Sequence, residues 1–456
     1  MKHVVTLMLA SIILNTMVIP VSASPTRSAS NAPSAVNVPS FLVLRGGGNC
    51  DTAPLPPSCP TSIEGLDRPN LAIASFDGGP EVTVTAYQPG NKTPVSVNAL
   101  TNKLSGINFA DLSTNGGLVA WYGNPDSPCT MHLNAIGEEI GCISISIPQN
   151  YTPMQAVFLN DETGMPRYLT YVLVDNSQQK NWILELLNLY THNYVEWIAP
   201  YQLANNKVPP VGFSGVANVL GWRPKAKTII LAVHKAFSEQ AYDAIYSLNI
   251  AGLTLTNNRQ PFPSAKMLVA ADIGTAAALS PDGTKLVYLR ADPNNQPTGY
   301  QPYHRPDGGT LTPTGLTVID SATGKIITSY DATQTQGFGT YTWTLDSQRL
   351  LFTTGLFQQK YGYAVMPTIN TLDLESGTVT PGGLLSSDPT AHIRELRACA
   401  TALFYFVDYP RIGAGEGGDG VPETTIYSAP LADLATSNKL DVVGAMTAVN
   451  CVPPEY

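Results

Sequence analysis

A repeated pattern of strand, tight turn and strand constrains this chain more than any other feature of its sequence. The clearest copy is Ala278–Tyr288, in which Ser280-Pro281-Asp282-Gly283 separates a short apolar stretch from a second one. Proline presets the negative φ of the first turn corner, and glycine accepts the positive φ that follows. The unit therefore predicts two antiparallel strands joined by a tight turn.

Weaker copies of this unit recur along the chain, and the last of them lacks turn residues. They span residues 109–121, 158–171, 220–231, 341–352 and 396–406. Each is followed by a second hairpin, of which Leu316–Ile327, turning at Thr323-Gly324, is the clearest. The other second hairpins are expected at 131–147, 183–197, 245–255, 371–379 and 425–443. Alternation of apolar and polar residues favours strand over helix throughout.

Residues 71–75 and 82–97 add one more set, so seven sets recur at a spacing of roughly 50–65 residues. Four antiparallel strands at such a period are typical of a β-propeller blade. We therefore expect an all-β fold, a single β-propeller over residues 41–456 with seven four-stranded antiparallel blades. Six or eight blades are the alternatives. Phe41–Leu44 is expected to add a strand to the first or last blade and so close the ring.

The Ser280–Gly283 unit resembles the blade repeat of the TolB-like propellers, which are similar to WD-repeat propellers. The same repeat is found in the propeller of prolyl-oligopeptidase-type enzymes. The resemblance implies that Ser280, Pro281, Asp282 and Gly283 form the turn between the first two strands of a blade. It implies no functional residue.

The first residues are typical of an export signal. Lys2 precedes an apolar stretch that ends at Pro20, and Val21-Ser22-Ala23 offers small residues for cleavage before Ser24. We interpret residues 1–23 as a signal peptide, with a membrane anchor as the alternative, and residues 24–40 as a Ser/Pro-rich flexible leader. The protein is then secreted, periplasmic or held at the cell surface, with no transmembrane segment after cleavage.

The chain has six cysteines, at Cys50, Cys59, Cys129, Cys142, Cys399 and Cys451. In an exported protein they are expected to form disulfides. Their grouping favours pairs of neighbours: Cys50 with Cys59, Cys129 with Cys142, and Cys399 with Cys451. A zinc site is the alternative, but no C-x-x-C occurs.

Only 13% of the residues are charged, and the formal net charge is -9. This balance argues against nucleic-acid binding, which needs clustered basic charge. Gly413–Gly418 matches G-x-G-x-x-G, but the Asp419–Pro422 stretch that follows cannot begin a helix to hold a phosphate. No G-x-S-x-G motif of a hydrolase occurs. We predict no cofactor and no metal site, although a calcium ion held on the propeller axis by separate blades stays open.

Three long loops are the best candidates for a binding surface. They span residues 291–314, 355–367 and 409–423, and each is expected to join the second strand of a blade to the third. Exposed tyrosine and arginine in long loops are typical of binding sites. The candidate binding residues are Tyr300, Tyr303, His304, Arg305, Asp307, Tyr361, Tyr363, Tyr409 and Arg411.

These observations predict an exported, non-catalytic β-propeller, monomeric, that binds a protein, peptide or glycan partner through one face. The alternative is a propeller enzyme, such as a hydrolase, lyase or lactonase, with an axial and metal-dependent active site.

Overall fold

The computed structural model shows how the clearest repeat folds. The Ser280 amide donates to the Lys285 carbonyl at 2.8 Å, and the Gly283 amide donates to the Ser280 carbonyl at 2.8 Å. Gly283 has a φ of +72°, as the turn requires. The Asp282 carboxylate accepts from the Thr284 amide at 2.9 Å. These bonds join β18 (Ile273–Leu279) to β19 (Lys285–Arg290), which confirms the predicted turn between the first two strands of a sheet.

A second kind of turn joins third strands to fourth strands. The Asp320 carboxylate accepts from the Thr323 amide at 2.8 Å, and Gly324 follows at a φ of +79°. In the next sheet, Asp373 accepts from the Ser376 amide at 2.8 Å, and Gly377 follows at +69°. An Asp that accepts local amide hydrogens, followed by a glycine, ends one strand and begins the next.

The structure describes the backbone of short strands between residues 40 and 132, and then residues 148–452 with gaps at 149, 163–165, 176–181, 199–216, 235–241, 261–262, 271–272, 291–312, 334, 359–362, 387, 410–422 and 441–444. Side chains are described for part of residues 148–439. The predicted signal peptide and nearly all of the predicted leader lie outside the described residues.

The sheets follow one another along the chain, and we call seven of them blades 1 to 7. Blade 1 consists of β30 (Ala445–Val452), β1 (Ser40–Arg45), β2 (Asn70–Ser75) and β3 (Val82–Thr83). Blade 2 consists of β6 (Ala110–Leu112), β7 (Leu118–Trp121) and β8 (Cys129–His132). Blade 3 consists of β9 (Tyr151–Asn160), β10 (Pro166–Asp175), β11 (Trp182–Asn188), β12 (Tyr194–Ile198) and β16 (Asn258–Gln260).

The remaining blades have four strands each. Blade 4 consists of β13 (Ala217–Arg223), β14 (Thr228–His234), β15 (Tyr242–Asn249) and β17 (Ala265–Ala270). Blade 5 consists of β18, β19, β20 (Gly315–Asp320) and β21 (Ile326–Asp331). Blade 6 consists of β22 (Gln336–Trp343), β23 (Arg349–Gln358), β24 (Tyr363–Asp373) and β25 (Val379–Leu384). Blade 7 consists of β26 (His392–Ala398), β27 (Ala402–Tyr409), β28 (Glu423–Pro430) and β29 (Asn438–Leu440).

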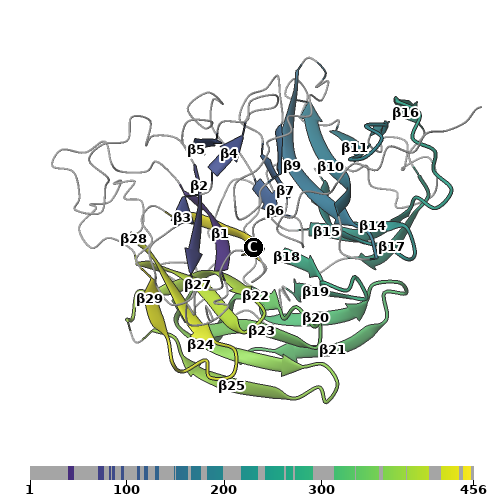
Figure 1. Ribbon diagram of the computed structural model, residues 1–456. Helices are drawn as coiled ribbons and strands as arrows, with labels where there is room; N and C mark the ends of the chain where they lie inside the picture. Colours follow the sequence, from purple (N-terminus) through teal and green to yellow (C-terminus); the bar gives the residue numbers. More distant parts are fainter. Residues whose placement is uncertain are drawn as a thin grey trace, which may run out of the picture. The chain divides into compact units, whose positions relative to one another are not determined.

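The first strands of successive blades link the blades in a closed series (Figure 1). β30 contacts β6, β6 contacts β9, β9 contacts β13, and β13 contacts β18. The Trp343 indole of β22 donates to the Ala278 carbonyl of β18 at 3.2 Å. β22 contacts β26, and β26 contacts β30. Residues 38–456 are thus a β-propeller, as the repeat predicted.

The series closes where the two ends of the propeller pair. β1 pairs antiparallel with β30, and Phe41 lies opposite Cys451 in this register. The prediction that Phe41–Leu44 adds a strand to the first or last blade is therefore confirmed. A blade built from both ends of the chain ties the first repeat to the last.

Five of the seven blades have four antiparallel strands within the described residues, as predicted, and two depart from that number. Blade 2 has three strands within the part of the chain that the structure describes, and blade 3 has five. The fifth strand, β16, pairs parallel with β12, so one edge of the propeller is not antiparallel. A separate hairpin of β4 (Thr85–Tyr87) and β5 (Pro94–Ser96) follows blade 1.

The second hairpin expected at 245–255 is also wrong. β15 covers its first half, but Leu253 and Leu255 belong to no strand, and β15 pairs with β17 instead. The chain between β15 and β17 crosses to blade 3, where it forms β16. Alternating leucines thus line a contact between two blades, which a pattern of local alternation cannot distinguish from a strand.

The hydrophobic core lies between neighbouring blades. Blades 3 and 4 share a cluster that includes the fully buried Trp197 and Ile229. Blades 5 and 6 share a cluster around Leu316 and Phe352, whose side chains are likewise buried. Each blade therefore needs its neighbours to cover its two faces, as expected of a repeat that cannot bury its apolar residues alone.

Cys399, at the end of β26, is buried and disulfide-bonded. Cys129 and Cys451 lie on described strands, whereas Cys50, Cys59 and Cys142 lie outside the described residues. The predicted pairing therefore stays a prediction. Among the described residues, no helix is long and apolar enough to cross a membrane.

Candidate functional site

The predicted binding loops can be located by the strands that flank them. Residues 291–314 connect β19 to β20, residues 359–362 connect β23 to β24, and residues 410–422 connect β27 to β28. All three therefore join a second strand to a third strand, in three consecutive blades, as expected. Because strands alternate in direction within a blade, these connections leave the same end of blades 5, 6 and 7.

The extent of the middle loop was predicted wrongly. Phe357 pairs with Ala364, and Gln358 pairs with Tyr363, so most of the expected loop 355–367 belongs to β23 and β24. Tyr363 is thus the first residue of a strand. Aromatic residues are as typical of strands as of binding loops, so the aromatic residues of this segment did not distinguish the two.

Most of the candidate binding residues lie outside the described residues. These are Tyr300, Tyr303, His304, Arg305, Asp307, Tyr361 and Arg411. The Gly413–Gly418 motif lies outside them too. Tyr409 is the candidate whose side chain the structure describes.

Tyr409 is the last residue of β27, at the point where the chain enters the connection 410–422. Its hydroxyl shares a hydrogen bond of 3.2 Å with the hydroxyl of Tyr427. Tyr427 in turn stacks on Tyr405, with ring centroids 5.4 Å apart. Burial, and then the hydrogen bond to Tyr427, raise the pKa of Tyr409 well above its usual range. The residue is half-buried.

A charged cluster of His392, Arg394 and Asp408 lies at the same end of blade 7. The Asp408 carboxylate is buried, 3.4 Å from Nε of Arg394 and 3.8 Å from Nε2 of His392. Arg394 also lies over the ring of Phe406, 5.4 Å from its centroid. Burial lowers the pKa of His392, although the Asp408 charge opposes this effect. The Arg394 side chain is partly exposed, so it can present a positive charge to an acidic group.

The described residues include no group of three or more His, Cys, Asp or Glu side chains placed to hold a metal ion. This finding concerns only the part of the chain that the structure describes. Among those residues, the candidate binding sites are the charged cluster of blade 7 and a cavity between blades 3 and 4.

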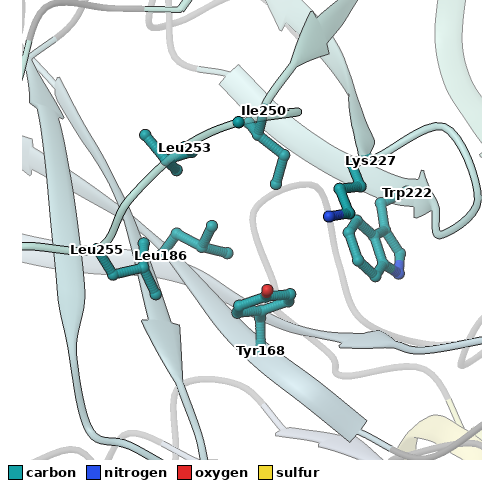
Figure 2. A pocket seen from close by; sticks show the side chains of 8 residues that line it. Tyr168, Leu186, Trp222, Lys227, Ile250, Leu253 and Leu255 are labelled. Atoms are coloured by element: carbon teal, nitrogen blue, oxygen red, sulfur yellow. The ribbon is translucent and has the colours of Figure 1, made fainter.

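The cavity has a volume of about 160 Å³ (Figure 2). Tyr168 of β10 and Leu186 of β11 line it from blade 3, and Trp222 of β13 lines it from blade 4. The segment that crosses from β15 to β16 closes it with Ile250, Leu253 and Leu255. Lys227, in the turn between β13 and β14, lies at its rim.

The crossing segment is held against blade 3 by polar contacts. The Asn257 amide donates to the Tyr194 carbonyl at 2.9 Å, and the Asn257 side chain accepts from the Tyr194 amide at 2.8 Å. Arg259 of β16 pairs with Glu196 of β12 at 3.4 Å. Opposite Glu196, Glu185 is buried, and its burial raises its pKa to about 8, with the Glu196 charge as the second cause. A raised pKa favours the neutral carboxyl of Glu185, which lessens its repulsion of Glu196 beside the strand that closes the cavity.

Sequence reasoning did not find this cavity. Its lining comes from two blades and from a segment that had been expected to form a hairpin. The one signal in the sequence is that the turn of the repeat at 220–231 has Lys227 where glycine would be easier to accommodate. In the structure Lys227 has a φ of +48°.

Comparisons with known proteins find remote structural neighbours. No protein-family model matches the chain, and no curated protein matches it. A Kuenenia stuttgartiensis hydrazine synthase is 13% identical, with a TM-score of 0.42 over 71% of this chain and 79% of that one. An oligogalacturonate lyase in complex with manganese is 11% identical, with a TM-score of 0.45 over 80% of this chain and 84% of that one. A prolyl endopeptidase is 10% identical, with a TM-score of 0.46 over 77% of this chain and 46% of that one.

These neighbours are β-propeller proteins, and the likeness extends to the fold alone. At such identities nothing about substrate or activity passes from them to this chain. The assignment of a propeller depends on the strand order and the contacts between first strands described above.

Proposed function

We propose that this chain is an exported, non-catalytic β-propeller that binds a protein, peptide or glycan partner. The surface we propose lies at the end of blades 5, 6 and 7 where second strands lead to third strands. The candidate residues are those named from the sequence, with Tyr409 at the base of one connection and Arg394 beside it.

The observation that carries this proposal is the contrast between the two ends of these blades. At one end, tight turns such as Ser280–Lys285 and Asp320–Lys325 use their polar groups in local hydrogen bonds. At the other end, the connections 291–314 and 410–422 are much longer and carry Tyr300, Tyr303 and Arg305 in the first of them. Long connections on a rigid scaffold are where binding residues concentrate.

A closer relationship to the TolB-like propellers is part of the proposal. Its support is that Ser280–Gly283 forms the turn between the first two strands of blade 5, as in that family's repeat. Export is likewise proposed from the first 23 residues, and N-terminal sequencing of the mature protein should then begin at Ser24. A mature chain that still begins at residue 1 would contradict export with cleavage.

The binding surface can be tested without knowing the partner. The protein is immobilised and used to select from a random phage-displayed peptide library and to probe a glycan array. In the test variant, Tyr300–Asp307 is replaced by a Gly-Ser segment of equal length. We expect the wild-type selection to enrich a family of peptides or glycans and the variant to lose that family at least about tenfold, the loss of a single binding hot spot.

The matched control changes exposed residues at the opposite end of the same blades, with Lys325→Ala and Glu375→Ala. It should select the same ligands as the wild type. Thermal unfolding of both variants should stay within a degree or two of the wild type, since surface substitutions cost about 0.5 kcal/mol or less. If the test variant retains the selected ligands, the surface is assigned to the wrong end of the blades.

A further inference from the structure

Aliphatic and aromatic side chains line the cavity between blades 3 and 4, together with polar atoms and one charged side chain, Lys227. Leu186 and Ile250 are buried walls, and Leu253 and Leu255 face them from the crossing segment. No acidic side chain is among the residues that line it. We infer that this cavity binds a small carboxylate whose body is a single ring, with the ring inside and the carboxylate at Lys227.

The size of the cavity fits one ring. Its volume of about 160 Å³ is close to that of an engineered apolar cavity of about 150 Å³ that stays dry and binds benzene. A much smaller ligand would leave apolar surface without contacts.

Two aromatic rings form one wall of the cavity in a fixed arrangement. Tyr168 and Trp222 meet edge to face, with centroids 5.6 Å apart and planes at 85°. The Trp222 indole donates to the Asn160 carbonyl at 2.5 Å, so its polar group is used and its carbon surface is what faces the cavity. Aromatic walls of this kind favour a planar apolar ligand.

Lys227 supplies the charge. Its amide donates to the Pro224 carbonyl at 3.2 Å, and its carbonyl accepts from the Ile250 amide at 2.9 Å. These bonds hold a lysine at a φ of +48°, a conformation that is strained for a residue other than glycine. The Lys227 ammonium and the Tyr168 hydroxyl point into the cavity (Figure 2). No ion pair joins Lys227 to a carboxylate of the described residues.

The chemistry of the lining therefore selects against other ligands. A cation would be repelled by Lys227, and a neutral ring would lose the one charge contact that the rim offers. The cavity lies at the end of the blades where first strands turn into second strands, opposite the surface proposed above. Its ligand site is thus independent of the proposed partner surface, and either can fail alone.

The test uses the full chain and phenylacetate as the probe. Binding is measured by isothermal titration calorimetry and by saturation transfer from the protein to the phenyl protons. Phenylacetamide, which keeps the ring and the shape without the charge, is measured beside it. We expect phenylacetate to bind more tightly than phenylacetamide by about two- to fivefold, the contribution of one partly exposed charge contact.

Two variants locate the site. Lys227→Met keeps the aliphatic stem and should lower phenylacetate affinity to that of phenylacetamide, without changing phenylacetamide binding. Leu253→Trp fills the cavity and should abolish binding of both probes. The matched control is Lys225→Met, which removes an exposed lysine two residues away and should leave both affinities unchanged.

Three results would overturn the proposal. The first is that phenylacetate does not bind at 10 mM, about the weakest affinity of interest for so small a ligand. The second is that Lys227→Met and the wild type bind phenylacetate with equal affinity. The third is that a folded Leu253→Trp variant still binds the probes. If Leu253→Trp unfolds, the Lys227→Met and Lys225→Met pair decides alone.

Discussion

In blade 5 the turn between the first two strands is Ser280–Lys285, and in blade 6 the equivalent turn is Thr344–Arg349. The first matches the repeat at every turn position, whereas the second has neither the proline nor the glycine. Both turns nevertheless make the same bonds. The Thr344 amide donates to the Arg349 carbonyl at 3.0 Å, and the Ser347 amide donates to the Thr344 carbonyl at 2.9 Å.

The two turns differ in what surrounds the residue at positive φ. A Cβ on Gly283 would lie 3.0 Å from the Trp222 carbonyl of blade 4, closer than an ordinary contact, so a side chain is unfavourable there. Ser347 has a φ of +58°, and its hydroxyl accepts the Asp282 amide of blade 5 at 3.1 Å. One position therefore needs the absence of a side chain, and the other uses its side chain to join two blades. The repeat therefore keeps its hydrogen bonds while the residues that make them change.

Gly283→Ala should have the largest effect on stability. The added Cβ meets the Trp222 carbonyl, and alanine at a φ of +72° is strained as well. We expect the free energy of unfolding to fall by about 2–4 kcal/mol, measured by denaturant titration.

The matched control is Gly377→Ala, at a φ of +69° with open space around the added Cβ. It carries the backbone cost alone, about 1 kcal/mol. Equal losses in the two variants would show that the contact with blade 4 contributes nothing.

Asp282→Ala should have the next largest effect on the free energy of unfolding. Asp282 accepts from the Ser280 hydroxyl at 2.6 Å and from the amide and hydroxyl of Thr284 at 2.9 and 2.8 Å. Asp346 accepts from the Thr344 hydroxyl at 2.6 Å and from the Gln348 amide at 3.0 Å. We expect a loss of about 1–2 kcal/mol for Asp282→Ala and about half of that for Asp346→Ala. The same denaturant titration decides, and a larger loss at Asp346 would contradict the ranking.

These turns also show why the fold was predictable and the site was not. Ser280–Gly283 and Thr323-Gly324 specify their turns by local chemistry. Neighbouring residues were therefore enough to predict these strands and the closing strand at Phe41–Leu44. Even the 396–406 copy, without turn residues, forms two strands, because the Cys399 amide still bonds the Ala402 carbonyl at 2.7 Å. The cavity depends instead on where the segment after Ile250 goes. That path is decided by contacts with blade 3, which no local pattern records.

Acid should weaken both turns. The pKa of Asp282 is lowered by its hydrogen bonds to Ser280 and Thr284 against the opposing effect of burial, and that of Asp346 is lowered chiefly by the hydroxyl of Thr344. A carboxyl with a lowered pKa stabilises the fold above its unfolded pKa, and that stability is lost as the pH falls through the folded pKa. The free energy of unfolding should therefore decline below about pH 4. The double variant Asp282→Asn and Asp346→Asn should decline less steeply, and an unchanged slope would contradict these assignments.

Ser347→Gly should have the smallest effect, because it changes two opposing terms. Glycine removes the strain at a φ of +58°, but it also removes the hydroxyl that accepts the Asp282 amide. These terms are each about 1 kcal/mol, so the net change in the free energy of unfolding should be within about 0.5 kcal/mol. Ser347→Ala keeps the strain and loses the acceptor, and it should cost about 1 kcal/mol. Equal stabilities of the two variants would mean that backbone strain at Ser347 is negligible, and that the role of glycine at this turn position is confined to Gly283 and its contact with blade 4.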